Sequence, residues 1–303
     1  MPALPPPRAA NERPNADGLG HDAWRERIYL LGLSLPALAL ITVTMVVPVG
    51  WLFWLSLFAD DGRMSLVNYR RLVEQPSYGR ILLATFEISA LTTALCVVLG
   101  YVLAYMLSQL PPRRAAFCMI GVLMPFWTSI LVRTYAWLVL LQRDGLINGW
   151  GITLGLWRTP LALVYNLDGT VIGLVHIMLP FLVLPLYGSM RAIDRDYLKA
   201  AANLGAGPLQ VFWRVFFPLS QPGLFAGTVI VFILCLGSYV TPAVLGGGKV
   251  IMVANAVASE IDLFSNWGAA SALGVVLLLA TAILLYAVSR VIRLDRALGG
   301  GGS

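Results

Sequence analysis

The residues best able to do chemistry are the few titratable side chains that interrupt long apolar runs. Glu87 and Arg133 are two such charges, and His176 lies in a third apolar run. An ionised group in hydrocarbon is costly and persists where it faces a cavity or a partner. Glu87 can therefore bind a cationic solute or pair with Arg133. Glu87 and His176 could alternatively relay protons, although a packed, hydrogen-bonded histidine is the commoner case.

Aromatic side chains near the ends of the apolar runs could hold an ammonium group against a ring face. Trp127, Tyr135, Trp137 and Tyr239 are the candidates. Aromatic residues at such positions also anchor helices at the membrane interface, which we favour for Trp137. Trp127 and Tyr239 stand beside Pro and Gly breaks and fit a solute path better. Arg133 is expected to orient the helices or a gate, or to indicate a solute that also carries an anionic group.

The residues that other kinds of chemistry need are not assembled. The Gly246–Lys249 run lacks the spacing of a phosphate-binding P-loop. Cys96, Cys118 and Cys235 have no CxxC spacing and resemble small core residues. No Ser/His/Asp or metal-ligand grouping is apparent. We therefore expect no catalytic residue, no metal and no cofactor on this chain.

The composition is that of a polytopic membrane protein. Hydrophobic residues make up 58% of the chain and charged residues only 12%, whereas a soluble domain is about 25% charged. The net charge of +6 comes largely from Lys and Arg that flank apolar runs. The positive-inside rule accounts for such residues, so the basic balance indicates a lipid bilayer and no nucleic acid.

Six apolar runs are long enough to cross a bilayer, which takes about 20 helical residues. They cover 28–58, 81–107, 115–141, 170–190, 223–244 and 269–292. Pro180 and Pro185 should kink the fourth run. The N-terminal residues 1–27 are Pro-rich and lack the apolar core of a signal peptide, so we expect a flexible cytosolic tail there. We expect one six-span domain over 28–298. The last residues, 299–303, resemble an appended linker.

The basic residues favour an orientation with both termini in the cytosol. Arg113, Arg114, Arg191 and Arg290 are among those that this arrangement places inside. The outer segments 60–80, 142–169 and 245–268 then have room for short interfacial helices. They could dock an extracytoplasmic partner or simply cover the bundle. Their acidic residues could steer cations, but singly they are typical solvated loop charges: Asp144, Asp168, Glu260 and Asp262.

One cytosolic segment, residues 193–222, predicts two helices joined by a glycine elbow. Asp194 or Asp196 can cap a first helix that extends to about residue 204. Gly205 allows the left-handed conformation in which helices commonly end. Pro208, directly after Gly207, starts a second helix. This helix continues over 209–217, and we expect Pro218 and Pro222 to close it.

This segment resembles the "EAA" coupling loop of permease subunits of bacterial ABC importers. The resemblance rests on Ala200-Ala201, Leu204-Gly205-Ala206, Phe212, Arg214-Val215, Pro218-Leu219 and Pro222-Gly223. It implies that the loop, with Asp196 and Lys199 on its first helix, docks against an ATPase. The usual glutamate before the two alanines is Lys199 here, so the role of that carboxylate does not carry over.

Two further motifs are similar to spermidine/putrescine-type permeases, specifically the first of their two permease subunits. They are 125–129 with 133–137, and 237–242 with 245–247. The resemblance implies an all-α type I ABC importer permease in the bacterial inner membrane. It further implies a second permease subunit, two ATPase subunits that bind ATP and Mg, and an extracytoplasmic solute-binding protein. The implied solute is a polyamine; an amino acid derivative, an aminophosphonate or iron is the alternative, and a proton-driven transporter is the rival class.

Overall fold

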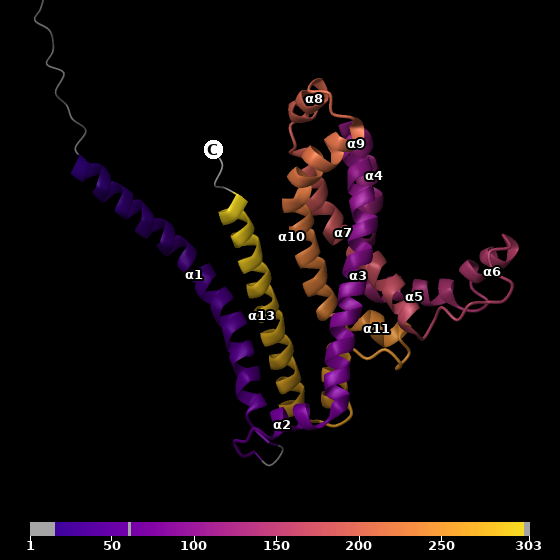
Figure 1. Cartoon of the computed structure of the whole chain (residues 1–303). Helices are drawn as coiled ribbons and strands as arrows, with labels where there is room; N and C mark the ends of the chain where they lie inside the picture. The colour runs from indigo at the N-terminus through magenta and orange to yellow at the C-terminus, as the bar shows by residue number, and fades with distance from the viewer. Residues whose placement is uncertain (1–15, 60–61, 300–303) are drawn as a thin grey trace, which may run out of the picture. The chain divides into compact units, whose positions relative to one another are not determined.

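A computed structural model of the chain describes residues 16–59 and 62–299 (Figure 1). Most of the described residues are helical, and loops and an isolated bridge between Phe58 and Met64 connect the helices. Within this described part of the chain, five helices are long and apolar enough to cross a membrane, and a sixth span results if one sharply bent pair is counted. The prediction of an all-α, multi-span fold is confirmed.

The first helix begins earlier than the sequence predicts. Helix α1 covers Ala16–Ser56, so residues 16–27 of the expected tail are helical. The prolines of the tail all lie at or before residue 14, and beyond them no residue forbids a helix. Residues 1–15 and 300–303 lie outside the described residues, so the tail and linker predictions are otherwise untested. The chain divides at Trp54 into two units, and the following concerns the second.

Three helices form the centre of this second unit. They are α3 (Pro76–Gln109), α7 (Leu167–Arg191) and α10 (Phe217–Leu236). Helix α7 contributes three fully buried leucines, Leu174, Leu182 and Leu186. It matches the predicted fourth run and continues through both of its prolines. Helix α13 (Trp267–Gly299) extends beyond the predicted last run at both ends.

Glycines let these three helices approach closely. A Cβ atom at Gly100 would come within 2.4 Å of a Leu182 methyl group, and one at Gly223 within 2.7 Å of the Pro185 carbonyl oxygen. Without a hydrophobic driving force in lipid, helices associate through such close packing of small residues. The core therefore depends on side chains being absent at these positions.

Gly223→Ala should destabilise the bundle, because the new methyl group would meet backbone atoms of α7 that cannot rotate away. Overpacking of this kind costs about 1–3 kcal/mol. Thermal unfolding of the purified protein in detergent measures the loss. Gly188→Ala is the matched control, since nothing lies within 4 Å of a Cβ atom there. Equal unfolding temperatures for the two variants would contradict this packing.

The third apolar run does not form a straight span. Helix α4 (Pro112–Leu123) is followed by a 3-10 turn, η1 (Met124–Trp127), and α5 (Ile130–Leu141), with a bend of 100° between the two halves. Pro125 cannot donate the next helical hydrogen bond, and Thr128 and Ser129 are extended. The predicted continuous helix over 115–141 is therefore wrong.

The fifth run is also longer and earlier than predicted. Helix α9 (Pro208–Val211), a π-helical turn η2 (Phe212–Phe216) and α10 form one span from Pro208 to Leu236. The Phe217 N–H bonds the Phe212 carbonyl, so the wider turn places Pro218 in the first turn of α10, where its missing donor is tolerated. Pro218 and Pro222 therefore do not close the helix. The last part of the predicted run, residues 240–244, belongs to a separate helix, α11 (Val240–Leu245).

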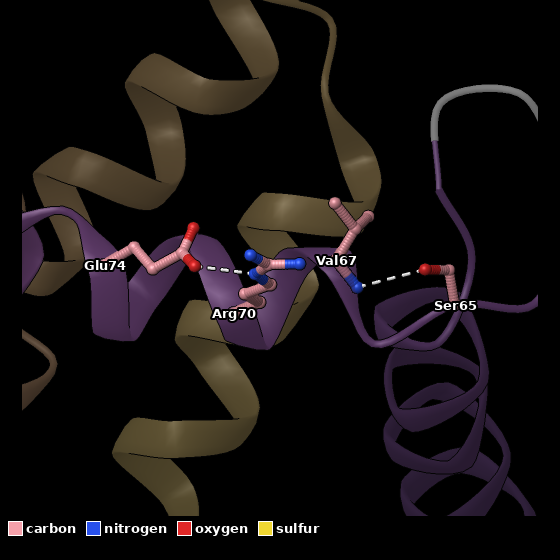
Figure 2. A network of polar contacts seen from close by, with 4 residues as sticks. All are labelled: Ser65, Val67, Arg70 and Glu74. Carbon is pink, nitrogen blue, oxygen red and sulfur yellow. Dashed lines mark hydrogen bonds and ion pairs between the residues drawn. The ribbon is translucent and has the colours of Figure 1, made fainter.

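Each of the three predicted outer segments contains a short helix, as expected. They are α2 (Val67–Glu74), α6 (Leu146–Thr153) and α12 (Val253–Asp262). Helix α2 begins at the Ser65 hydroxyl, which accepts the Val67 N–H, and carries an exposed ion pair between Arg70 and Glu74 (Figure 2). Buried Asn68 ties it to the preceding chain by donating to the Phe58 carbonyl at 2.8 Å.

Candidate functional site

The segment after α7 folds as the predicted helix–glycine–helix. Helix α8 covers Arg195–Asn203, and of the two predicted caps Asp194 is the one used: its carboxylate accepts the Asp196 N–H at 2.9 Å. At the other end Gly205 has φ +86°. The Gly205 N–H bonds Ala202 O and the Ala206 N–H bonds Ala201 O, at 3.0 and 3.1 Å. These two bonds form a Schellman motif, which requires a left-handed residue at the position of Gly205.

This loop projects from the end of the bundle where α3 and α7 finish (Figure 1). The Arg191 guanidinium donates to the carbonyls of Ser108 and Leu110 at 3.4 and 3.5 Å and so links the two helix ends. Leu204 and Leu209 beyond it are 89% and 72% exposed. The loop therefore presents apolar side chains that none of the described residues covers.

Lys199 forms an ion pair within its own helix. Its ammonium Nζ lies 2.8 Å from the Asp196 carboxylate, and both side chains are exposed. Ala200 on the same helix is also exposed, whereas Leu198 packs against the core. The charge at the usual glutamate position is thus accompanied by an acidic partner one turn earlier.

Aromatic rings join the second helix of the loop to α3. The Tyr105 ring packs edge-on against Phe212 and Phe216, with ring centres 5.4 and 5.2 Å apart. Tyr101 packs against Phe217 at 5.7 Å, and its hydroxyl lies 3.0 Å from that of Ser220. We call these rings the aromatic clasp. Arg214 in the same turn points to the surface, and Pro218 lies beside the clasp in sequence.

Glu87 faces a cleft of about 810 Å³. The cleft lies between α3, the start of α7 at Leu167 and the segment 249–251 that precedes α12. Arg80 and Lys249 line the same cleft, and most of its remaining wall is apolar. The Glu87 side chain is exposed to this space.

The alternative ion pair between Glu87 and Arg133 does not form. The ion pairs found among the described side chains do not include it, and the Arg133 Nε atom is buried without a hydrogen-bond partner. The 100° bend before α5 is the reason, because it packs α5 against α7 and α11. The Trp137 ring lies 5.5 Å from that of His176 on α7, so Trp137 packs against α7 and is partly buried.

The remaining aromatic candidates do not converge on Glu87. Tyr239 lines a second cleft of about 350 Å³ together with Asp262 and Asn255, and its carbonyl accepts from the Asn255 amide at 3.0 Å. Trp127 and Tyr135 are exposed and line neither of these two clefts. The segment Val250–Ile251 borders both clefts and separates them.

Sequence reasoning missed the residues that hold the wall of the Glu87 cleft. The Tyr78 hydroxyl donates to the Glu260 carboxylate at 2.6 Å, and Glu260 is only 9% exposed, so its interpretation as a solvated loop charge is wrong. The Thr85 hydroxyl accepts the first N–H of α12, from Val253, at 2.9 Å. Both bonds join α3 to α12, and no local pattern predicts a pairing across such sequence separations.

Comparison with known proteins decides the family. Residues 21–294 match the family described as binding-protein-dependent transport system inner membrane component. The chain belongs to this family. It is 34% identical to the spermidine/putrescine transport system permease protein PotB of Haemophilus influenzae over 74% of this chain and 78% of that protein. The corresponding protein of Escherichia coli K12 is 34% identical over 73% of this chain and 81% of its own length.

A solved structure shares the fold. In the crystal structure of a bacterial alginate ABC transporter with its alginate-bound periplasmic protein, one chain superposes with a TM-score of 0.71 at 14% identity. The match covers 93% of this chain and 99% of that one. The protein is thus a multi-pass inner-membrane permease subunit of an ABC importer. Its relatives are permease subunits and not enzymes. Among the described residues no group of three or more His, Cys, Asp or Glu could hold a metal ion.

Proposed function

We propose that this permease forms half of the translocation path for spermidine- or putrescine-like cations. The observation that carries this function is the Glu87 carboxylate, which faces a cleft of about 810 Å³ with a mostly apolar wall and forms no ion pair with any described residue. A single carboxylate in an apolar cleft suits an alkylammonium group, which offers a charge and a methylene chain. The substrate named for the permeases that are 34% identical supports the same class.

Separate subunits complete the proposed importer. A second permease, a different chain, forms the other half of the path, and a solute-binding protein delivers the solute to the outer side. Two ATPase subunits bind ATP and Mg and receive the exposed loop that carries Leu204 and Leu209. This arrangement places both termini in the cytosol, on the side that the basic residues favour.

The coupling path runs from this loop through the aromatic clasp. The second helix of the loop continues into α10 without interruption, so movement of the loop tilts the whole span. The clasp transmits that tilt to α3, because Tyr101 and Tyr105 lie on the helix that also bears Glu87. ATP-driven closure of the ATPases would thereby alternate access to the cleft.

Tyr105→Leu should lower the number of solute molecules imported per ATP hydrolysed. The substitution removes two edge-on ring contacts, worth about 0.5–1.5 kcal/mol each beyond area burial, while keeping an apolar side chain. Uptake and hydrolysis measured in the same proteoliposomes give the ratio. Phe117→Leu, at an exposed ring on α4, is the control and should leave the ratio unchanged. An unaltered ratio for Tyr105→Leu would remove the clasp from the coupling path.

Reconstitution distinguishes the proposed importer from a proton-driven transporter. In proteoliposomes with the partner permease, ATPases and binding protein, labelled spermidine should enter only with internal ATP and should be insensitive to a proton ionophore. His176 packs against Trp137, and no hydrogen bond joins it to Glu87 among the described residues, so a relay between them lacks a connection. Uptake without ATP that an ionophore abolishes would overturn the proposal.

A further inference from the structure

We propose that Lys249, together with Arg80, acts as a charge filter that admits cations whose charges are separated by an apolar chain. The filter selects such solutes over compact polyvalent cations at the Glu87 cleft. This inference rests on the proposed function, because it assumes that the solute is cationic.

The side chains that line the cleft carry more positive than negative charge. Glu87 is the one acidic residue among its lining side chains, whereas Arg80 and Lys249 are both basic. The cleft of a proposed cation importer therefore has a positive balance. The other lining residues are largely aliphatic and can cover a methylene chain: Ile81, Ala84, Ile88, Leu91, Val250 and Ile251.

The position of Lys249 is determined by the fold on both sides of it. Gly247 and Gly248 precede it with φ +54° and +75°, and the Tyr165 ring packs so closely on Gly247 that a Cβ atom there would lie 2.2 Å from it. On the other side, the Val253 N–H is held by Thr85 at 2.9 Å. The backbone is thus held by Tyr165 on one side of Lys249 and by Thr85 of α3 on the other. The Lys249 side chain is exposed and lines the cleft.

Arg80 and Glu87 lie at different depths along α3. They are seven residues apart on α3, which separates them by about 10 Å along the helix axis. Arg80 is near the start of the helix and Glu87 two turns further in. An ammonium group that enters from the Arg80 end passes one basic side chain before it reaches Glu87, and it shares the cleft with a second, Lys249.

The length of the solute then decides its affinity. A compact polyvalent cation brings all its charge to one point and meets a positive balance. A long polyamine can place one ammonium at Glu87 and extend the next beyond Arg80 and Lys249, with methylene groups on the apolar wall. A short diamine keeps its second ammonium close to both basic groups and is repelled. Uptake should therefore favour longer spacings.

The test compares labelled 1,3-diaminopropane with labelled spermidine in proteoliposomes that contain the complete importer. Lys249→Met and Lys249→Gln should both raise the diaminopropane-to-spermidine ratio of initial uptake rates by about fivefold, the order expected for one partly screened charge. Lys249→Arg, which keeps the charge, should preserve the wild-type ratio. Because the same binding protein is used throughout, a changed ratio originates in this chain.

Arg158→Met is the matched control, because it removes an exposed positive charge from the outer segment 142–169 without lining the Glu87 cleft. An unchanged ratio in both neutral Lys249 variants, or an equal change in Arg158→Met, would overturn the filter and leave polyamine import standing. No uptake of any amine by the wild-type importer would instead refute the proposed function, and the filter with it.

Discussion

Gly205→Val should reduce ATP-driven uptake at least about tenfold while the bundle remains folded. Gly205 has φ +86°, a conformation that a β-branched residue adopts only at a cost of about 1–3 kcal/mol. The chain would relieve this strain by giving up the bonds from Gly205 and Ala206 to the end of α8. The elbow would then no longer hold α8 at a defined angle to the span that follows. Uptake and ATP hydrolysis in the reconstituted importer measure the effect.

Two substitutions in the same elbow separate the conformational effect from simple bulk. Gly207→Ala is the control, because Gly207 has φ −68° and open space around a Cβ atom; it should keep full uptake. Gly205→Asn should retain more uptake than Gly205→Val, since Asn tolerates the left-handed region. Full uptake by Gly205→Val with normal coupling to hydrolysis would show that the elbow geometry is dispensable.

Glu87→Gln should lower the uptake efficiency for spermidine about tenfold, which corresponds to about 1.4 kcal/mol. The substitution keeps the shape of the side chain and removes the one negative charge from the cleft, where Arg80 and Lys249 would then act unopposed. A charge-assisted hydrogen bond to an ammonium group becomes a weaker neutral one. Initial uptake rates over a range of solute concentrations give the efficiency, and protein abundance in the membrane is measured in parallel.

Glu74→Gln is the matched control for this experiment. Glu74 pairs with Arg70 on α2 at 2.6 Å, and both side chains are largely exposed (Figure 2). An exposed pair of this kind contributes about 0–1 kcal/mol, so uptake should be unchanged. If Glu87→Gln left uptake efficiency intact while lowering abundance, Glu87 would have a structural role only.

Local rules predict the first helix and the glycine elbow of residues 193–222 well because their geometry is local. A carboxylate at 194, alanines in the helix, Gly205 and the proline at 208 each act on residues within one or two turns. The helix and the elbow accordingly form where the residue types predict them. The long apolar runs are equally informative, because a bilayer requires about 20 helical residues whatever the neighbours are.

The predicted and observed helices differ most at prolines, because the effect of a proline on a helix depends on the surrounding structure. Pro125 breaks the third run, whereas Pro180, Pro185 and Pro222 lie inside continuous helices. In a bundle, neighbouring helices and local π turns compensate for the lost hydrogen bond. The π turn before Pro218 is such a compensation, and no residue pattern within the run announces it.

Residue patterns alone establish a multi-span membrane protein with a helix–glycine–helix loop, because hydropathy and helix termination depend on residues close together in the chain. Which charges meet depends on the folded arrangement of the helices. The bend before α5 packs the helix that carries Arg133 against α7 and α11. The turn at Gly247 and Gly248 brings Lys249 to the cleft of Glu87. Such pairings depend on helix rotation and packing between distant segments, which no spacing along the chain encodes.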